Sequence, residues 1–261
     1  MSNNRKPGSM FLFQPPAPTR YDLRFNLLGT PVQVHPLFWV IALLLGSSGG
    51  IIQMLIWVLA VFVSILIHEM GHALAMRFYG QSSYIVLHFS GGLTVPESIS
   101  WGGRPANVGF SPNQNILISL AGPIAGFLLA GLLALGVVFS GGSIITTYLF
   151  GFIPLPLNAA LPIGGSILNS LITTLLWINI FWGLINLMPV YPLDGGNVAR
   201  YLLLQADPLN GVRKSLWLSV IAGSLVAAAG FFLLGSVYMA ILFGFLAFQS
   251  YQSLQGYTNR F

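Results

Sequence analysis

The sequence predicts an all-α polytopic membrane protein with about six transmembrane helices and a short membrane-associated β-hairpin after the second of them. Of its 261 residues, 55% are hydrophobic and only 6% are charged, whereas an ordinary soluble domain carries about 25% charged residues. The chain also has 30 glycines and 16 prolines, residues that are more frequent in transmembrane helices than in soluble ones. This composition excludes a water-soluble globule of this size.

Six apolar segments give the expected helices, because a helix that crosses the hydrocarbon layer needs about 20 mainly apolar residues. They span residues 35–48, 51–78, 114–139, 167–188, 214–234 and 236–253. The first is short, and a tight turn near Gly235 separates the last two. Residues 140–166 are apolar but interrupted by Gly and Pro, so we expect a partly embedded loop there. Residues 84–95, YIVLHFSGGLTV, are rich in β-formers around a Gly-Gly break and predict the hairpin.

Charge placement predicts the topology. With a cytoplasmic N-terminus, the inside segments are residues 1–34, 79–113, 189–213 and the C-terminal tail. The basic residues that lie in or beside these segments are Arg5, Lys6, Arg20, Arg24, Arg77, Arg104, Arg200, Arg213, Lys214 and Arg260. None lies outside, as the positive-inside rule expects. Both termini are therefore predicted to be cytoplasmic.

The predicted organisation has three parts. Residues 1–34 form a flexible cytoplasmic arm, residues 35–253 a single transmembrane domain and residues 254–261 a cytoplasmic tail. No internal repeat is found, which disfavours a transporter, since many transporters are built from repeats. The net charge of +5 is interpreted as a topology signal, and we expect the lipid bilayer rather than nucleic acid as a partner.

The few ionisable residues within the predicted spans indicate a metal-binding site. The chain has no cysteine, so any metal must be held by His, Asp or Glu. His68, Glu69 and His72 form an HExxH motif within the second span. Residues i and i+4 share a helix face, so both imidazoles can reach one ion, and Glu69, about 100° around the helix, can reach a water molecule on it. The structural alternative is a pair of histidines that bond across helices, but ionisable residues within a membrane span are functional candidates by default.

A catalytic zinc site normally has three protein ligands and one open water position. The candidates for the third ligand are Asp22, His35, His88, Glu97, Asp194 and Asp207. Asp194 stands out because Pro189 and Pro192 break the helix before it and the glycines after it allow close backbone approach. A carboxylate on irregular backbone at membrane depth is tolerated only where it lines a cavity. The structural alternative for Asp194 is a role as the cap of the next helix.

Two motifs carry a resemblance to a known family. HEMGH (68–72) together with NLMPVYPLDGG (186–196) resembles the site-2 protease family of intramembrane zinc metalloproteases, peptidase family M50. The residues to which the resemblance carries roles are His68, His72 and Asp194 as ligands of one zinc ion and Glu69 as the catalytic residue. The length leaves no room for the PDZ or CBS domain of some family members, so the resemblance implies a minimal form.

Further segments support this resemblance. SLAGPIAGF (119–127) is similar to the middle core helix of the family, although the usual GPxxN ends here in Gly126. HFSGGLTV (88–95) is similar to the hairpin after the first motif, and VHPLFW (34–39) is similar to the entry into the first span. The departure at Gly126 puts a role for the missing amide in doubt and leaves the expected zinc site unaffected.

The resemblance implies hydrolysis of a peptide bond in or near the transmembrane segment of a single-span membrane protein, as in regulated intramembrane proteolysis. Asn186 is then a candidate donor to the substrate or the oxyanion, with an interhelical amide bond as the alternative. His88, Gly91 and Gly92 are candidates for a strand edge to which an unwound substrate adds, with a purely structural hairpin as the alternative.

Two other functions fit the same polar residues. One is a transporter or channel that uses them as an ion path, and the other is a non-catalytic relative that binds transmembrane segments. The small core with short loops favours a prokaryotic cytoplasmic membrane as the location, with the active site toward the cytoplasmic side.

Overall fold

The computed structural model describes residues 16–46, 50–97, 109–149, 153–162 and 164–258. The chain divides into two compact units. One consists of Pro15–Val108 and Ala121–Leu184, and the other of Met1–Gln14, Gly109–Leu120 and Ile185–Phe261. We call them the first and the second unit, and each is described by itself.

Five of the described helices are long and apolar enough to cross a membrane. They are α2 (Gly50–Phe78), α3 (Pro112–Phe139), α4 (Gly165–Asn186), α6 (Gly211–Phe232) and α7 (Val237–Thr258), and they agree with the last five predicted spans. The first predicted span is instead α1 (Pro36–Leu45). Its ten residues give about 15 Å of helix, half the thickness of the hydrocarbon layer. The chain is therefore a multi-pass membrane protein.

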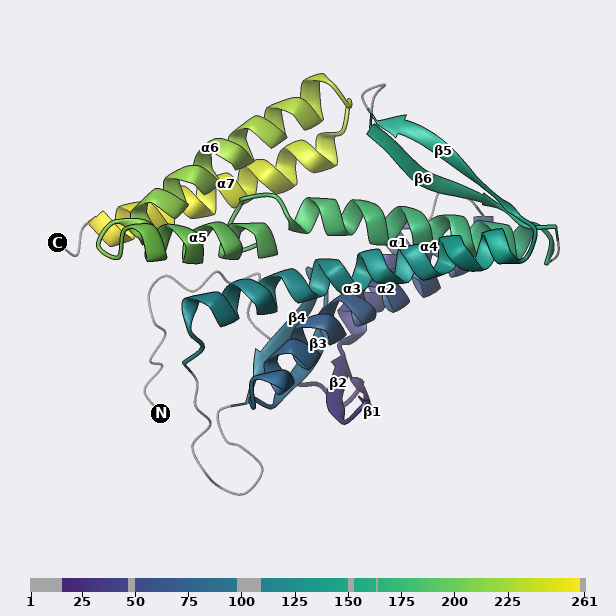
Figure 1. Ribbon diagram of the computed structural model, residues 1–261, viewed down its shortest axis with the longest axis horizontal. Coiled ribbons are helices and arrows are strands. Elements are labelled where there is room, and N and C mark those ends of the chain that lie inside the picture. The colour runs from purple at the N-terminus through teal and green to yellow at the C-terminus, as the bar shows by residue number, and fades with distance from the viewer. Residues whose placement is uncertain (1–15, 47–49, 98–108, 150–152, 163, 259–261) are drawn as a thin grey trace. The chain divides into compact units, whose positions relative to one another are not determined.

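A four-stranded sheet in the first unit contains the predicted hairpin (Figure 1). Its strands are β1 (Leu23–Leu27), β2 (Thr30–Val34), β3 (Ser83–His88) and β4 (Gly91–Pro96), in the order β1-β2-β3-β4. The pairs β1–β2 and β3–β4 are antiparallel, and β2–β3 is parallel. The hairpin prediction is confirmed, and the hairpin β3–β4 forms one half of a larger sheet.

The expected flexible arm over residues 1–34 is wrong for residues 23–34, which form β1 and β2. Val32 and Val34 of β2 are buried in one cluster with Phe38, Ile85 and Leu87. The partner strand β3 lies about fifty residues further along the chain, so the local sequence alone did not indicate the pairing. Non-local packing of this kind is what makes a short strand stable.

The turn between β1 and β2 is attached to the end of α2. Leu28 and Gly29 both have positive φ there. The guanidinium of Arg77, in the last turn of α2, donates 2.6 Å hydrogen bonds to the carbonyl of Leu28 and to Oγ1 of Thr30. These bonds tie the sheet to the helix that carries the HExxH motif.

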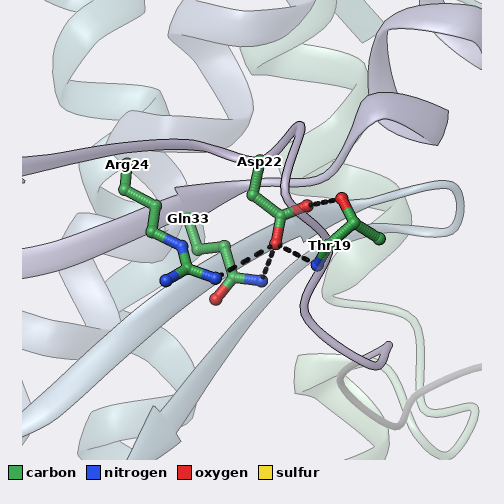
Figure 2. Close-up of polar contacts among 4 residues, drawn as sticks. All are labelled: Thr19, Asp22, Arg24 and Gln33. Atoms are coloured by element: carbon green, nitrogen blue, oxygen red, sulfur yellow. Dashed lines mark hydrogen bonds and ion pairs between the residues drawn. The ribbon is translucent and has the colours of Figure 1, made fainter.

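The start of the sheet is fixed by the carboxylate of Asp22 (Figure 2). It accepts hydrogen bonds from the backbone N–H of Thr19 at 2.7 Å, from Oγ1 of Thr19 at 2.6 Å and from Nε2 of Gln33 on β2 at 2.8 Å. Nη2 of Arg24 lies 3.5 Å from Oδ2 of Asp22. Burial by itself raises the pKa of Asp22, but the bonds from Thr19 and Arg24 outweigh it and lower this pKa below 3.8. The carboxylate is thus committed to a local structural role.

Residues 140–166 differ from the expected loop, because they contain an antiparallel hairpin of β5 (Ser143–Leu149) and β6 (Ile153–Ala160). A loop was expected because Gly and Pro interrupt this segment, among them Pro154 and Pro156 of β6. Proline is nevertheless compatible with an edge strand, where its missing N–H faces away from the partner. Among the described residues β6 pairs only with β5, so it is such an edge strand.

The second unit is helical. It contains α5 (Asp194–Ala206) and the antiparallel pair α6 and α7 (Figure 1). A Cβ at Gly223 of α6 would lie 3.1 Å from Cβ of Ala247 in α7, so these two helices approach closely. Gly235, with φ of 62°, lies in the turn between them, as predicted.

The connection between α5 and α6 is expected to be acid-sensitive. Asp207 accepts hydrogen bonds from Nζ of Lys214 at 2.8 Å and from the backbone N–H of Asn210 at 3.0 Å, and these contacts lower its pKa from 3.8 to about 2. Because the folded pKa is the lower one, this carboxylate stabilises the fold above about pH 4, and the contribution is lost as the pH falls through about 2.

Hydrogen exchange, corrected for the intrinsic rate, measures this effect. Protection of the Asn210 amide should fall between about pH 4 and pH 2, whereas that of Gly211, which donates to the backbone carbonyl of Asp207, should change less. In Asp207→Asn the acid step at Asn210 should be absent. Equal acid steps in both proteins would contradict the assignment.

Candidate metal centre

His68 and His72 lie one turn apart on α2, and both side chains are buried. Their Nε2 atoms are 3.2 Å apart. Two zinc–nitrogen bonds of about 2.0–2.1 Å at a tetrahedral angle place their nitrogens about 3.3 Å apart. The pair therefore has the spacing that one shared zinc ion requires.

Gly122 of α3 leaves space beside both nitrogens. A Cβ built on this residue would lie 2.8 Å from Nε2 of His68 and closer still to Nε2 of His72. A side chain at this position would thus occupy the place that an ion near both histidines needs. The two helices also approach closely at Gly71, where a Cβ would lie 2.8 Å from Cβ of Ala125. Both glycines are needed for this packing of α3 against the HExxH motif.

Glu69 is buried beside the hairpin strand β4. Oγ1 of Thr94 lies 2.7 Å from Oε2 of Glu69 and 3.0 Å from its carbonyl oxygen, so the hydroxyl donates to the carboxylate or to the carbonyl. A Cβ at Gly92 would lie 2.5 Å from Oε1 of Glu69. The Gly-Gly break therefore lets the strand lie against this carboxylate. Sequence reasoning missed Thr94, although its place two residues after Gly92 puts it on the same face of β4.

Gly126, where the family pattern has an asparagine, lies beside an amide from another helix. Oδ1 of Asn179 in α4 is 3.4 Å from the position that a Cβ of Gly126 would take. Nδ2 of the same residue donates 2.8 Å bonds to Oγ of Ser64 and to the carbonyl of Leu175. Ser64 precedes His68 by one helical turn. Asn179 thus connects α4 to α2 directly before the metal motif.

His88 lies at the end of β3, opposite Gly91 of β4, and its expected role at a strand edge stays a prediction. It ends β3, an inner strand that pairs with both β2 and β4. Its side chain is only 1% exposed, and Ser90 Oγ lies 3.3 Å from its Nδ1. Burial, and to a smaller extent His35, lowers the pKa of His88, which favours a neutral ring at pH 7. Gly91 and Gly92 belong to β4, which pairs only with β3 among the described residues.

The remaining predicted residues lie in the second unit. Asp194 is the first residue of α5, and Asn186 is the buried last residue of α4. A Cβ at Gly195 would collide with the backbone of Leu187, and one at Gly196 would collide with that of Val190. The two glycines are therefore required where the loop passes the first turn of α5.

Three of the candidates for a third ligand have other roles. His35 is the N-cap of α1, where its Nδ1 accepts the N–H of Leu37 at 3.2 Å. Asp22 is held by the contacts of Figure 2, and Asp207 is paired with Lys214. The structure thus brings His68, Glu69 and His72 together with Gly122 and Thr94 in the first unit, while Asp194 and Asn186 belong to the second.

Two curated relatives of this chain carry the words zinc metalloprotease in their names. The chain is 26% identical over 188 residues to a zinc metalloprotease of Methanocaldococcus jannaschii, covering 70% of this chain and 46% of the relative. It is 30% identical over 195 residues to a Synechocystis protein named as a candidate zinc metalloprotease, covering 69% of this chain and 43% of the relative. The chain therefore spans less than half the length of these curated relatives.

A solved structure has a similar fold. The site-2 protease from Methanocaldococcus jannaschii superposes with a TM-score of 0.53 at 23% identity, covering 90% of this chain and 95% of that one. The sequence model of peptidase family M50 matches residues 56–228, which include both the HExxH motif and Asp194. The chain belongs to peptidase family M50, the site-2 protease family.

Proposed function

We propose that this protein is an intramembrane zinc metalloendopeptidase that hydrolyses a peptide bond in or near the transmembrane segment of a single-span membrane protein. The observation that carries the proposal is the buried His68–His72 pair, whose nitrogens are 3.2 Å apart next to the space that Gly122 leaves. Glu69 lies between these two ligands in the sequence and is itself buried. The family and the names of the relatives support a zinc metalloprotease.

The proposed ligands of one zinc ion are His68, His72 and Asp194. They offer two imidazole nitrogens and a carboxylate oxygen, a donor set that can hold a metal ion and that leaves one position open in a tetrahedral site. When bound, zinc polarises a carbonyl oxygen and makes water more acidic. Three other candidates for the third ligand already form local contacts elsewhere and are therefore less suited to bind the metal. They are Asp22, His35 and Asp207.

Glu69 is the proposed general base and acid. Its carboxylate accepts a proton from the attacking water and then delivers it to the amine that leaves, which is the usual task of a carboxylate in such a site. Thr94 orients this carboxylate by the 2.7 Å contact to Oε2. Asn186 is proposed to donate a hydrogen bond to the substrate or to the oxyanion.

The substrate is proposed to bind as an added strand. A helical substrate buries its scissile bond in its own hydrogen bonds, so it must unwind before hydrolysis. β4 pairs only with β3 among the described residues, and its residues Gly92 and Thr94 contact Glu69. A strand that paired with the other edge of β4 would lie beside the catalytic carboxylate.

The proposed topology has both termini in the cytoplasm of a prokaryotic cell, with the active site toward the same side. This proposal rests on the positions of the basic residues and on α2, which ends at Phe78, about 15 Å of helix after His68. Water then enters from the cytoplasmic side. Since the chain has no cysteine, single cysteines introduced in the tail and the loops test this topology by labelling in intact cells.

Removal of the Thr94 hydroxyl is expected to slow cleavage. Thr94→Val keeps the shape of the side chain but not the hydrogen bond to Glu69, and a bond to a charged group contributes about 1.5–3 kcal/mol. We expect kcat to fall about 10-fold or more, with unchanged zinc content and KM. Thr94→Ser should stay near wild type. Equal kcat values for the valine and serine variants would contradict a role for the hydroxyl.

The function is tested with purified protein in liposomes that contain single-span test substrates. Fragments identified by mass spectrometry, their loss on chelation and their return with zinc would support the proposal. A metal flux without cleavage would favour a transporter. Zinc-loaded protein that captures the substrates without cutting any of them would favour a non-catalytic binding protein.

A further inference from the structure

The loop that leads to Asp194 forms few hydrogen bonds between its own backbone groups. Pro189 and Pro192 carry no N–H group. The N–H groups that donate within the loop or to the last turn of α4 are those of Met188, Val190 and Leu193. The N–H of Tyr191 is bonded instead to another element, Oγ of Ser219 on α6, at 3.0 Å. This bond is a place where a membrane-spanning helix holds the loop.

The serine contacts use both polar groups of Tyr191. Its N–H donates to Oγ of Ser219, and its carbonyl accepts from Oγ of Ser250 on α7 at 3.4 Å. The hydroxyl of Ser219 also donates to the carbonyl of Ser215 at 2.9 Å, so it accepts one bond and donates one, as a hydroxyl can. Ser219 and Ser250 are at most 1% exposed. Each bond thus joins a polar backbone group of Tyr191 to a buried hydroxyl of α6 or α7.

Apolar packing holds the same loop. Val190 is fully buried in a cluster with Phe243 and Leu246 of α7. The short path from there to Asp194 is also bonded, because the N–H of Leu193 donates to the carbonyl of Val190 at 2.9 Å and Nδ2 of Asn197 lies 3.3 Å from the carbonyl of Pro192. A shift of Tyr191 is therefore transmitted to the first turn of α5.

We infer that Ser219 and Ser250 are positioning residues, through which the C-terminal helix pair α6–α7 fixes the carboxylate of Asp194. This inference rests on the proposed function, which makes Asp194 a zinc ligand. It assigns to the last two spans a role in the metal site, although none of their residues is a proposed ligand. Partners that orient metal ligands typically contribute about 10- to 100-fold to metal affinity.

The matched control is Ser215. It lies one turn before Ser219 on the same helix and is also buried, but its hydroxyl donates to the carbonyl of Val212 within α6 at 2.7 Å. Ser219→Ala is expected to weaken zinc binding about 10-fold or more and to speed hydrogen exchange at the amides of Tyr191 and Asp194. Ser219→Thr should restore both. Ser215→Ala should change each by less than about twofold, since it removes only a bond within the helix.

Two measurements on the full-length protein separate the possible failures. Unchanged amide exchange at Tyr191 and Asp194 in both Ser219→Ala and Ser250→Ala would overturn the inference, whatever the zinc affinity. Equal effects of Ser219→Ala and Ser215→Ala would also overturn it. If Asp194→Ala left zinc affinity unchanged, the proposed ligand set would fail, while the exchange data would still decide whether the serines position the loop.

Discussion

Replacement of Glu69 by glutamine is expected to reduce cleavage on the order of 10³-fold while the protein keeps its zinc. The amide has nearly the shape of the carboxylate and can still interact with Thr94, which lies 2.7 Å from Oε2. It cannot accept a proton from water at neutral pH. The initial rate of substrate cleavage and the zinc content per chain are the two quantities to measure.

Glu97→Gln is the matched control, because Glu69 and Glu97 are the two glutamates of the chain. The backbone N–H of Glu97 donates to the carbonyl of Ser82 at 2.8 Å, beside the end of β4, and its carboxylate has no part in the proposed reaction. Activity should therefore persist in this variant. Cleavage by Glu69→Gln at the wild-type rate would refute the assigned general base.

A single methyl group at Gly122 is expected to weaken zinc binding strongly. In Gly122→Ala the new Cβ would lie 2.8 Å from Nε2 of His68 and nearer to that of His72, within the space of the ion. Either the methyl group excludes the metal or α3 moves away from α2. We expect zinc affinity to fall at least about 100-fold, more than the usual effect of losing an orienting partner.

Gly131→Ala provides the control for helix α3. Apart from the nearby backbone of α3 itself, no atom of the described residues lies within 4 Å of the Cβ position at Gly131, so this exchange should leave zinc binding intact and favour the helix slightly. Circular dichroism would show whether both variants keep their helices. Normal zinc affinity in Gly122→Ala would contradict the proposed position of the ion.

The long apolar helices could be predicted from the sequence because length and composition determine them locally. α2 and α3 begin and end within two residues of the expected spans. The strands β1 and β2 could not be predicted, because β2 is stabilised by a parallel partner distant in the chain. The hairpin β5–β6 could not be predicted, because residues such as Pro154 and Pro156 indicate a loop although an edge strand tolerates them.

In the site, too, the features set by local sequence could be predicted, and those set by packing between distant elements could not. The spacing of His68 and His72 follows from helix geometry, and the observed 3.2 Å between their nitrogens agrees with it. The contact of Thr94 with Glu69 and the place of Gly122 beside the two histidine nitrogens could not be predicted, because they depend on how β4 and α3 pack against α2. The strand-edge role for His88 stays a prediction, because β2 pairs with Ile85–Leu87 of β3 and, among the described residues, His88 itself pairs with Gly91 of β4.

The proposal of one zinc ion held by His68, His72 and Asp194 can be tested by X-ray absorption at the zinc edge. We expect about one zinc per chain, with two imidazole nitrogens at about 2.0–2.1 Å and oxygen as the other ligands. Asp194→Ala should lose affinity and one oxygen ligand. Wild-type protein without zinc, or an Asp194→Ala spectrum and affinity identical to wild type, would contradict the account.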